Sequence, residues 1–154
     1  MGLDMYIYKH TYVGMFEDVS ITYKDRNGET HSCHWDNHWD SEYPHITDYK
    51  ETVGYWRKSY AIHTWFENNL ANGELDNCRE YDISIEQIKE LLDTCKVISE
   101  HHNLADKLLP YINCTGISTY SDEDFEDIES TIRQLETLIK NYKEGDEFTY
   151  YASW

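Results

Sequence analysis

The fold is decided by the stretch VSITYKDRNGETHSCHW, residues Val19–Trp35. Two β-prone runs, Val19–Lys24 and Glu29–Trp35, flank the four residues DRNG. The dipeptide Asn-Gly is the strongest short signal for a β-hairpin, because both residues tolerate a positive φ. We therefore predict a hairpin whose second arm runs on into a loop.

The second arm of this hairpin begins a window that is rich in metal ligands. His31–Asp40 has the sequence HSCHWDNHWD, and a further histidine, His45, follows. Imidazole and thiolate are the ligands that zinc prefers, and a structural site needs four of them. Side chains alternate along a strand, so His31 and Cys33 would share one face, with His34 on the other. The candidate zinc ligands are His31, Cys33, His34, His38 and His45.

The spacing of these ligands matches no standard zinc pattern, which leaves two interpretations open. In the first, zinc fastens the loop onto the hairpin. In the second, the histidines are solvated in a polar loop and Cys33 packs as a small hydrophobic residue.

Patterns typical of strands and of helices follow one another along the rest of the chain. The two end segments, Leu3–Val13 and Phe148–Trp154, predict strands that pair with each other. Helical spacing predicts three helices, from Glu51 to Leu70, from Ser84 to about His102, and from Ser121 to Gly145. We therefore expect an α+β fold in which the N-terminal hairpin and the C-terminal strand form an antiparallel sheet packed with about three helices.

Two of these helices carry clear start signals. Ser84 and Gln87 form a capping box, and Ser121 is an N-cap followed directly by acidic residues that suit the positive end of a helix. The core face predicted for the last helix consists of Phe125, Ile128, Ile132, Leu135, Ile139 and Tyr142. His63 and Cys95 fall near the apolar stripes of their helices, so packing explains both better than chemistry does.

Length and composition favour a single domain spanning residues 1–154. The four cysteines are widely scattered, the N-terminus has no signal-peptide pattern, and no window reaches the length of a membrane span. These features indicate a cytosolic protein whose cysteines are reduced thiols or bind a metal.

Charge decides which partners are plausible. Thirty acidic residues against thirteen basic ones give a formal net charge of −17, which repels nucleic acid. The same excess is attracted to a strongly basic protein surface, such as a nucleic-acid channel; the alternative is that acidity serves solubility alone. The candidate partner-binding residues are Asp122, Glu123, Asp124, Glu126, Asp127, Glu129, Glu144, Asp146 and Glu147.

The common catalytic motifs do not occur in this sequence. It has no Gly-rich phosphate loop, no Gly-x-Ser-x-Gly elbow and no His-Glu-x-x-His. We therefore expect a protein that is not an enzyme. The alternative is a small hydrolase built on an open zinc site, with Asp36, Asp40 or Glu42 as its base.

Several segments together resemble a family of small acidic proteins encoded by phages and prophages of Gram-positive bacteria. They are MGLDMYIYK at residues 1–9, VGYWRK at 53–58 with Ile62-His63 and Trp65-Phe66, Asp76-Asn77-Cys78, LLDTC at 91–95 and Leu108-Leu109-Pro110. Within such phage proteins, the chain looks like a zinc-carrying anti-CRISPR protein directed at the type II effector Cas9. This resemblance implies a protein of the host bacterial cytoplasm that binds the nuclease and hinders guide loading or target-DNA capture. A phage structural or housekeeping protein is the other reading of the same resemblance.

Overall fold

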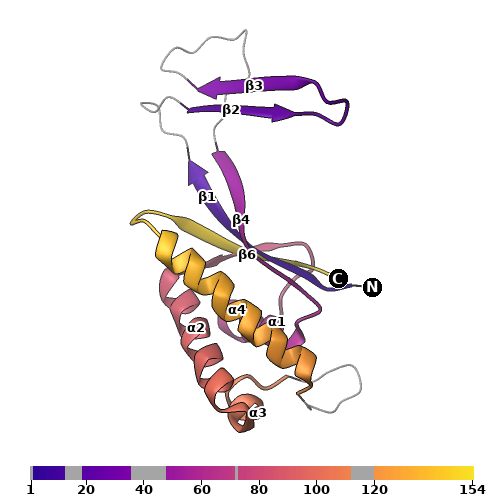
Figure 1. Cartoon of the computed structure of the whole chain (residues 1–154), viewed down its shortest axis with the longest axis vertical. Coiled ribbons are helices and arrows are strands. Elements are labelled where there is room, and N and C mark those ends of the chain that lie inside the picture. Colours follow the sequence, from indigo (N-terminus) through magenta and orange to yellow (C-terminus); the bar gives the residue numbers. More distant parts are fainter. Residues whose placement is uncertain (1, 13–18, 36–47, 72, 112–119) are drawn as a thin grey trace. The chain divides into compact units, whose positions relative to one another are not determined.

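The computed structural model of the chain describes residues 2–12, 19–35, 48–71, 73–111 and 120–154 (Figure 1). The chain divides into two compact units, Met1–Lys9 with Glu51–Trp154, and His10–Lys50. We call them the core unit and the hairpin unit, and describe each by itself. That the chain forms a single domain stays a prediction.

The core unit is built on a four-stranded antiparallel sheet with the strand order β4-β1-β6-β5. Its strands are β1 (Asp4–Tyr12), β4 (Asp48–Arg57), β5 (Glu80–Ile83) and β6 (Glu147–Ser153), of which β1 and β4 run on into the hairpin unit. Because β1 and β6 are neighbours, the predicted pairing of the two end strands is confirmed.

Helices cover one face of this sheet, with α2 and α4 side by side (Figure 1). The helices are α1 (Tyr60–Leu70), α2 (Ile85–Glu100), α3 (Ala105–Leu108) and α4 (Asp122–Asn141), with a short 3-10 turn, η1 (His102–Leu104), between α2 and α3. Inward-facing residues of β1 and β6, such as Ile7 and Tyr150, pack against Phe66, Ile88 and Leu135 of the helices, all of them fully buried. The predicted α+β class is confirmed.

The prediction of one helix from Glu51 to Leu70 is wrong in its first half. Residues up to Arg57 belong to β4, and α1 begins only at Tyr60. At Gly54 a Cβ atom would lie 2.8 Å from the ring of Trp56, so this strand position needs glycine. Lys58 then takes a φ of 59°, which turns the chain from the strand into the helix. The aromatic and β-branched residues before it favour a strand, a preference that the helical spacing concealed.

The start of α4 is as predicted, but its buried face is rotated. Ser121 forms a capping box with Asp124, and Ser84 forms the predicted one with Gln87 at the start of α2. The buried residues of α4 are Ile128, Thr131, Leu135 and Leu138, whereas Phe125, Ile132, Ile139 and Tyr142 are only half-buried. The helix also ends at Asn141, before Gly145. Thr131 is fully buried, and its hydroxyl group accepts a hydrogen bond from Trp56 and donates one to the Asp127 carbonyl.

Two hydrogen bonds join α4 to the edge strand β4. The indole N–H of Trp56 donates to Oγ1 of Thr131 at 2.8 Å, and the backbone N–H of Tyr55 donates to Oε1 of Gln134 at 2.7 Å. The second bond occupies a backbone donor at the edge of the sheet, where a further strand would otherwise pair.

The described part of the hairpin unit contains the predicted hairpin together with the ends of β1 and β4. The hairpin forms a two-stranded sheet of its own, whereas it was expected to share a sheet with the C-terminal strand. Strands β2 (Val19–Lys24) and β3 (Thr30–Trp35) are antiparallel, with Tyr23 opposite His31 and Ile21 opposite Cys33. Every side chain of this unit whose exposure is described is exposed or half-buried. In the described residues of the whole chain, no helix combines the length and apolar character needed to cross a membrane.

Candidate functional site

The turn of the hairpin is held by one carboxylate. Oδ1 of Asp25 accepts hydrogen bonds from the backbone N–H groups of Asn27, at 2.8 Å, and Glu29, at 2.9 Å. The N–H of Gly28 donates to the Asp25 carbonyl at 3.0 Å, which closes a β-turn. Of the Asn-Gly pair, only Gly28 takes a positive φ, 83°. The turn therefore fixes the position of the Asp25 carboxylate.

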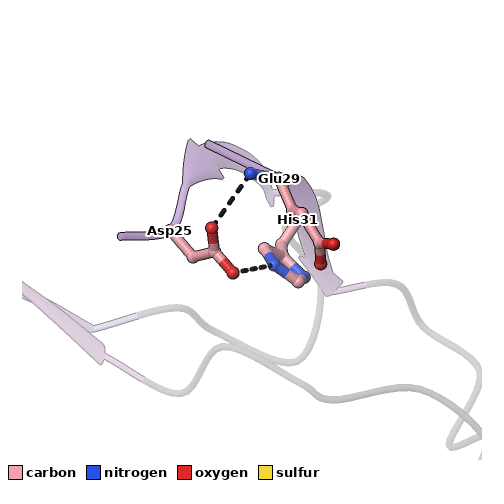
Figure 2. A group of neighbouring side chains, drawn as sticks. All are labelled: Asp25, Glu29 and His31. Atoms are coloured by element: carbon pink, nitrogen blue, oxygen red, sulfur yellow. Dashed lines mark hydrogen bonds and ion pairs between the residues drawn. The ribbon is translucent and has the colours of Figure 1, made fainter. Parts of the chain in front are cut away.

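The second oxygen of that carboxylate faces His31 across the hairpin. Oδ2 of Asp25 lies 3.1 Å from Nε2 of His31, and the Tyr23 ring stacks on the imidazole with centroids 5.4 Å apart. The hydrogen bond with His31 is the main reason that the pKa of Asp25 is lowered from its ordinary value. Figure 2 shows that Glu29 projects from the same turn beside His31.

Asp25, Glu29 and His31 form a possible metal-binding triad. Each offers one ligand atom, and the three atoms lie within 4.8 Å of one another. Two ligands of a tetrahedral zinc ion lie about 3.3 Å apart when each is about 2.0 Å from the metal. The separation of 3.1 Å between Asp25 and His31 is therefore compatible with a direct hydrogen bond or with shared coordination of an ion.

Only one predicted zinc ligand, His31, is part of this triad. Cys33 and His34 follow on β3, opposite Ile21 and Ser20 of β2. The two remaining predicted ligands, His38 and His45, lie outside the described residues, as do the candidate bases Asp36, Asp40 and Glu42. The predicted five-residue set is therefore not assembled within the described part of the chain.

Asp25 and Glu29 were missed by the sequence reasoning, which looked forward from His31 into the loop. The antiparallel register brings His31 back beside the turn, because it pairs with Tyr23, two residues before Asp25. An acidic residue at the start of a hairpin turn, with a histidine on the returning strand, is the signal that could have found the triad.

The predicted acidic residues fall into two groups at opposite ends of α4. Four in its first half, Asp122, Glu123, Glu126 and Glu129, are exposed. The other group, Glu144, Asp146 and Glu147, lies beyond the C-terminal end of the helix. A 20-residue helix is about 30 Å long, so the two groups do not form one patch.

Four of the predicted partner residues have structural contacts within the chain; one of them is Glu129, whose carboxylate accepts a hydrogen bond from the Ser99 hydroxyl. Asp124 accepts from the backbone N–H of Ser121 at 2.7 Å and from the Tyr111 hydroxyl at 3.0 Å. Asp127 is half-buried, and this burial raises its pKa. Asp146 forms an ion pair with Lys9 at 3.0 Å. The exposed carboxylates at the start of α4 are therefore the better candidates for binding.

A buried polar cluster lies within the core unit. His63 is 8% exposed; its Nδ1 lies 2.8 Å from the Tyr150 hydroxyl and its Nε2 lies 3.5 Å from the Glu67 carboxylate. Burial lowers the pKa of His63 to about 4 and raises that of Glu67. This agrees with the prediction of a core histidine, which has two polar neighbours, Tyr150 and Glu67.

Comparison with known proteins adds no relative to this description. No family model, no curated protein and no solved structure matches the chain.

Proposed function

We propose that this protein is a non-catalytic inhibitor that binds a basic, nucleic-acid-binding surface of a Cas9 nuclease and hinders guide or target-DNA engagement. The identity of the nuclease comes from the resemblance to phage anti-CRISPR proteins, and with it comes action in the host bacterial cytoplasm. Binding to a basic surface is supported by one observation, the row of exposed carboxylates on the first half of α4.

The charge density of this row is close to that of a nucleic-acid strand. Residues Asp122–Glu129 contain no lysine or arginine and span about 12 Å of helix. Their four exposed carboxylates, Asp122, Glu123, Glu126 and Glu129, amount to about one charge per 3 Å, against one per 3.4 Å along one DNA strand. A channel that attracts phosphates therefore attracts this face of α4.

The same argument predicts how binding responds to salt. Exposed charges of opposite sign attract one another through solvent, and salt screens this attraction beyond a Debye length of about 8 to 10 Å. Charge complementarity of this kind mainly raises the association rate. Binding carried by α4 should therefore weaken steeply with ionic strength.

A charge-neutral variant of α4 tests the proposal. Asp122→Asn, Glu123→Gln and Glu126→Gln together remove three exposed charges and leave Ser121 and Asp124 of the capping box intact. We expect the affinity for purified Cas9 to fall about tenfold or more, and its salt dependence to flatten. The readouts are biolayer interferometry at low and high salt and inhibition of DNA cleavage.

The matched control neutralises the same number of charges on α2. Glu86→Gln, Glu90→Gln and Asp93→Asn are also exposed, and Glu86 likewise lies in a first helical turn. If both triple variants lose affinity equally, general acidity binds Cas9 and α4 is not the site. If the wild-type protein neither binds Cas9 nor inhibits cleavage, the proposed partner is wrong.

We propose zinc as the cation for the Asp25–Glu29–His31 triad, where it would fasten the turn to the returning strand. Imidazole favours zinc over magnesium or calcium, and two carboxylates complete a mixed donor set. Isothermal titration with zinc should show a binding event that Glu29→Gln and His31→Gln each abolish, while Glu86→Gln on α2 leaves it intact. Equal zinc binding by all these proteins would refute the assignment.

A further inference from the structure

The face of the core sheet opposite the helices carries a cluster of tyrosines. Side chains alternate along each strand, and the buried residues of β1 and β6, such as Met5, Ile7 and Tyr150, point toward the helices. The positions between them therefore point the other way. They bring together what we call the tyrosine face: Tyr6 and Tyr8 of β1, Tyr55 of β4 and Tyr151 of β6.

The four rings form one continuous group. Tyr6 lies at its centre, with ring centroids 5.5 Å from Tyr8, 5.1 Å from Tyr55 and 6.0 Å from Tyr151. Tyr8 and Tyr151 are 6.1 Å apart. Three of these rings are half-buried and Tyr55 is 44% exposed. Three neighbouring strands thus present an aromatic platform, which the hydrophobic core does not use.

Carboxylates surround this platform. The Tyr55 hydroxyl donates to Asp4 at 2.8 Å, and Glu80 lies opposite Tyr151 in the β5–β6 pairing. By the same alternation, Asp82 of β5 and Glu147 of β6 also point outward. Arg57 is a cation on this face, and its side chain and that of Asp4 both lie beside Gly2. The excess of carboxylates gives the platform a negative rim.

The chain itself contains an example of what a tyrosine beside a carboxylate binds. Cζ of Arg79 lies 5.2 Å from the centroid of the Tyr81 ring, while its Nη1 donates to Asp76 at 2.7 Å. The Tyr81 hydroxyl donates to the same carboxylate at 3.2 Å. One guanidinium thus stacks on a ring and pairs with an acid at once, and the same hydrogen-bonded pair of a tyrosine and a carboxylate recurs as Tyr55 with Asp4.

We propose that the tyrosine face binds an arginine-bearing segment of a basic protein partner. Guanidinium groups stack on aromatic faces and donate bidentate hydrogen bonds to carboxylates, whereas a lysine ammonium offers only a compact charge. This inference rests on the proposed function only in taking the partner to be a basic protein. It adds a second contact surface and states which side chain that surface selects.

The charges on the face argue against two other occupants. Aromatic rings on a sheet also stack on the bases of single-stranded nucleic acid, but those sites track the phosphates with basic residues. Here the rim would repel phosphates. A second copy of the chain would bring the same carboxylates into contact with each other, which costs free energy unless cations separate them.

The test compares oligo-arginine and oligo-lysine peptides of equal length as probes for the intact protein. Both are attracted by the net charge, so a difference between them reports stacking. We expect oligo-arginine to bind about fivefold or more tightly, as stacking of two guanidinium groups would give.

Tyr6→Leu with Tyr151→Leu should remove this preference, and Tyr6→Phe with Tyr151→Phe, which keeps the rings, should retain it. Circular dichroism checks folding, and Tyr55→Leu, at the most exposed ring, gives a second variant should the leucine pair fail to fold.

The outcomes separate this inference from the function proposed above. Equal binding of the two peptides, or an arginine preference that survives both the leucine pair and Tyr55→Leu, would overturn the tyrosine face as an arginine site. Two other results would also overturn the arginine site, because they assign the face to another occupant. They are binding of single-stranded oligothymidine that depends on the rings, and self-association that depends on the rings in place of peptide binding. The triple variant of α4 should weaken both peptides alike and leave their ratio unchanged. If the protein shows an arginine preference that depends on the rings but does not bind Cas9, only the identification of Cas9 as the partner is refuted.

Discussion

The core unit and the hairpin unit are stabilised by different physical means. In the core unit, buried side chains from β1, β6, α1, α2 and α4 form one hydrophobic cluster. In the hairpin unit, none of the side chains whose exposure is described is buried, and the turn depends on hydrogen bonds to Asp25. A two-stranded hairpin alone is marginally stable in water. The tyrosine face therefore lies on a scaffold with its own hydrophobic core, whereas the metal triad depends on local hydrogen bonds.

The largest expected effect comes from the centre of the core unit. Leu135→Ala removes a fully buried side chain of α4 and should lower the free energy of unfolding by about 2 to 5 kcal/mol. Lys140→Ala, at an exposed position of the same helix, should change it by less than about 0.5 kcal/mol. Urea denaturation followed by circular dichroism measures both. Similar effects for the two variants would mean that burial on α4 does not stabilise the core unit.

The next effect is a dependence of core stability on pH. The pKa of His63 is about 4 in the folded chain because burial lowers it from 6.5. Between these two values the unfolded chain binds the extra proton, so the free energy of unfolding should fall as the pH drops from about 6.5 to about 4. The loss is on the order of 1 to 3 kcal/mol, since the Glu67 carboxylate partly offsets it. Urea denaturation at several pH values across this window measures how the free energy of unfolding changes with pH. This change should be smaller for His63→Gln than for the wild type, and equal changes would contradict the role assigned to His63.

A smaller effect is expected at the helix starts of the core unit. Ser121→Ala removes the acceptor for the Asp124 N–H, and Ser84→Ala does the same for Gln87 at α2. Each should lower the free energy of unfolding by about 1 kcal/mol. Thermal unfolding of the two variants beside Ser121→Asn, which preserves a capping oxygen, is the measurement. A loss in the asparagine variant equal to that in Ser121→Ala would show that the cap hydrogen bond is not the cause.

The smallest effect on the core should come from the hairpin. Asp25→Ala removes the acceptor of two backbone hydrogen bonds and should speed amide exchange in β2 and β3. The free energy of unfolding of the core unit should change by less than about 0.5 kcal/mol. Exchange followed by NMR reports both units in one sample, and Arg26→Ala in the same turn is the control. If Asp25→Ala lowers the free energy of unfolding of the core unit as much as the loss of a helix cap does, the two units are not stabilised independently.

The sequence predicted those parts of the fold whose signals are local. The capping box at Ser84, the N-cap at Ser121 and the hairpin around Asn27-Gly28 each depend on residues within a few positions of one another. The pairing of the first and last strands was predicted from their alternating patterns and is present in the sheet.

The errors arose where contacts distant in sequence decide the outcome. The apolar residues of β4 continue the helical spacing of α1, and this concealed both their preference for a strand and the pairing of β4 with β1. The hydroxyl group of the buried Thr131 accepts a hydrogen bond from Trp56, which is far away in the sequence. Neither fact is visible in a window of neighbouring residues.

The candidate site was predicted in part for the same reason. The ligand-rich window did identify His31, but its neighbours in the triad come from the preceding turn. The sequence does not show that α4 separates the candidate acidic residues into two groups. The tyrosine face was not anticipated, because its rings come from three strands at opposite ends and the middle of the sequence.

The hydrogen bond from the Tyr55 amide to Gln134 has a consequence for the behaviour of the protein at high concentration. A bare outer strand is a template on which other chains can add and grow into fibrils. Here a side chain of α4 already occupies one donor along that margin. Gln134→Ala would expose that donor. Losing this single amide group should therefore increase the tendency of the purified protein to polymerise by strand addition.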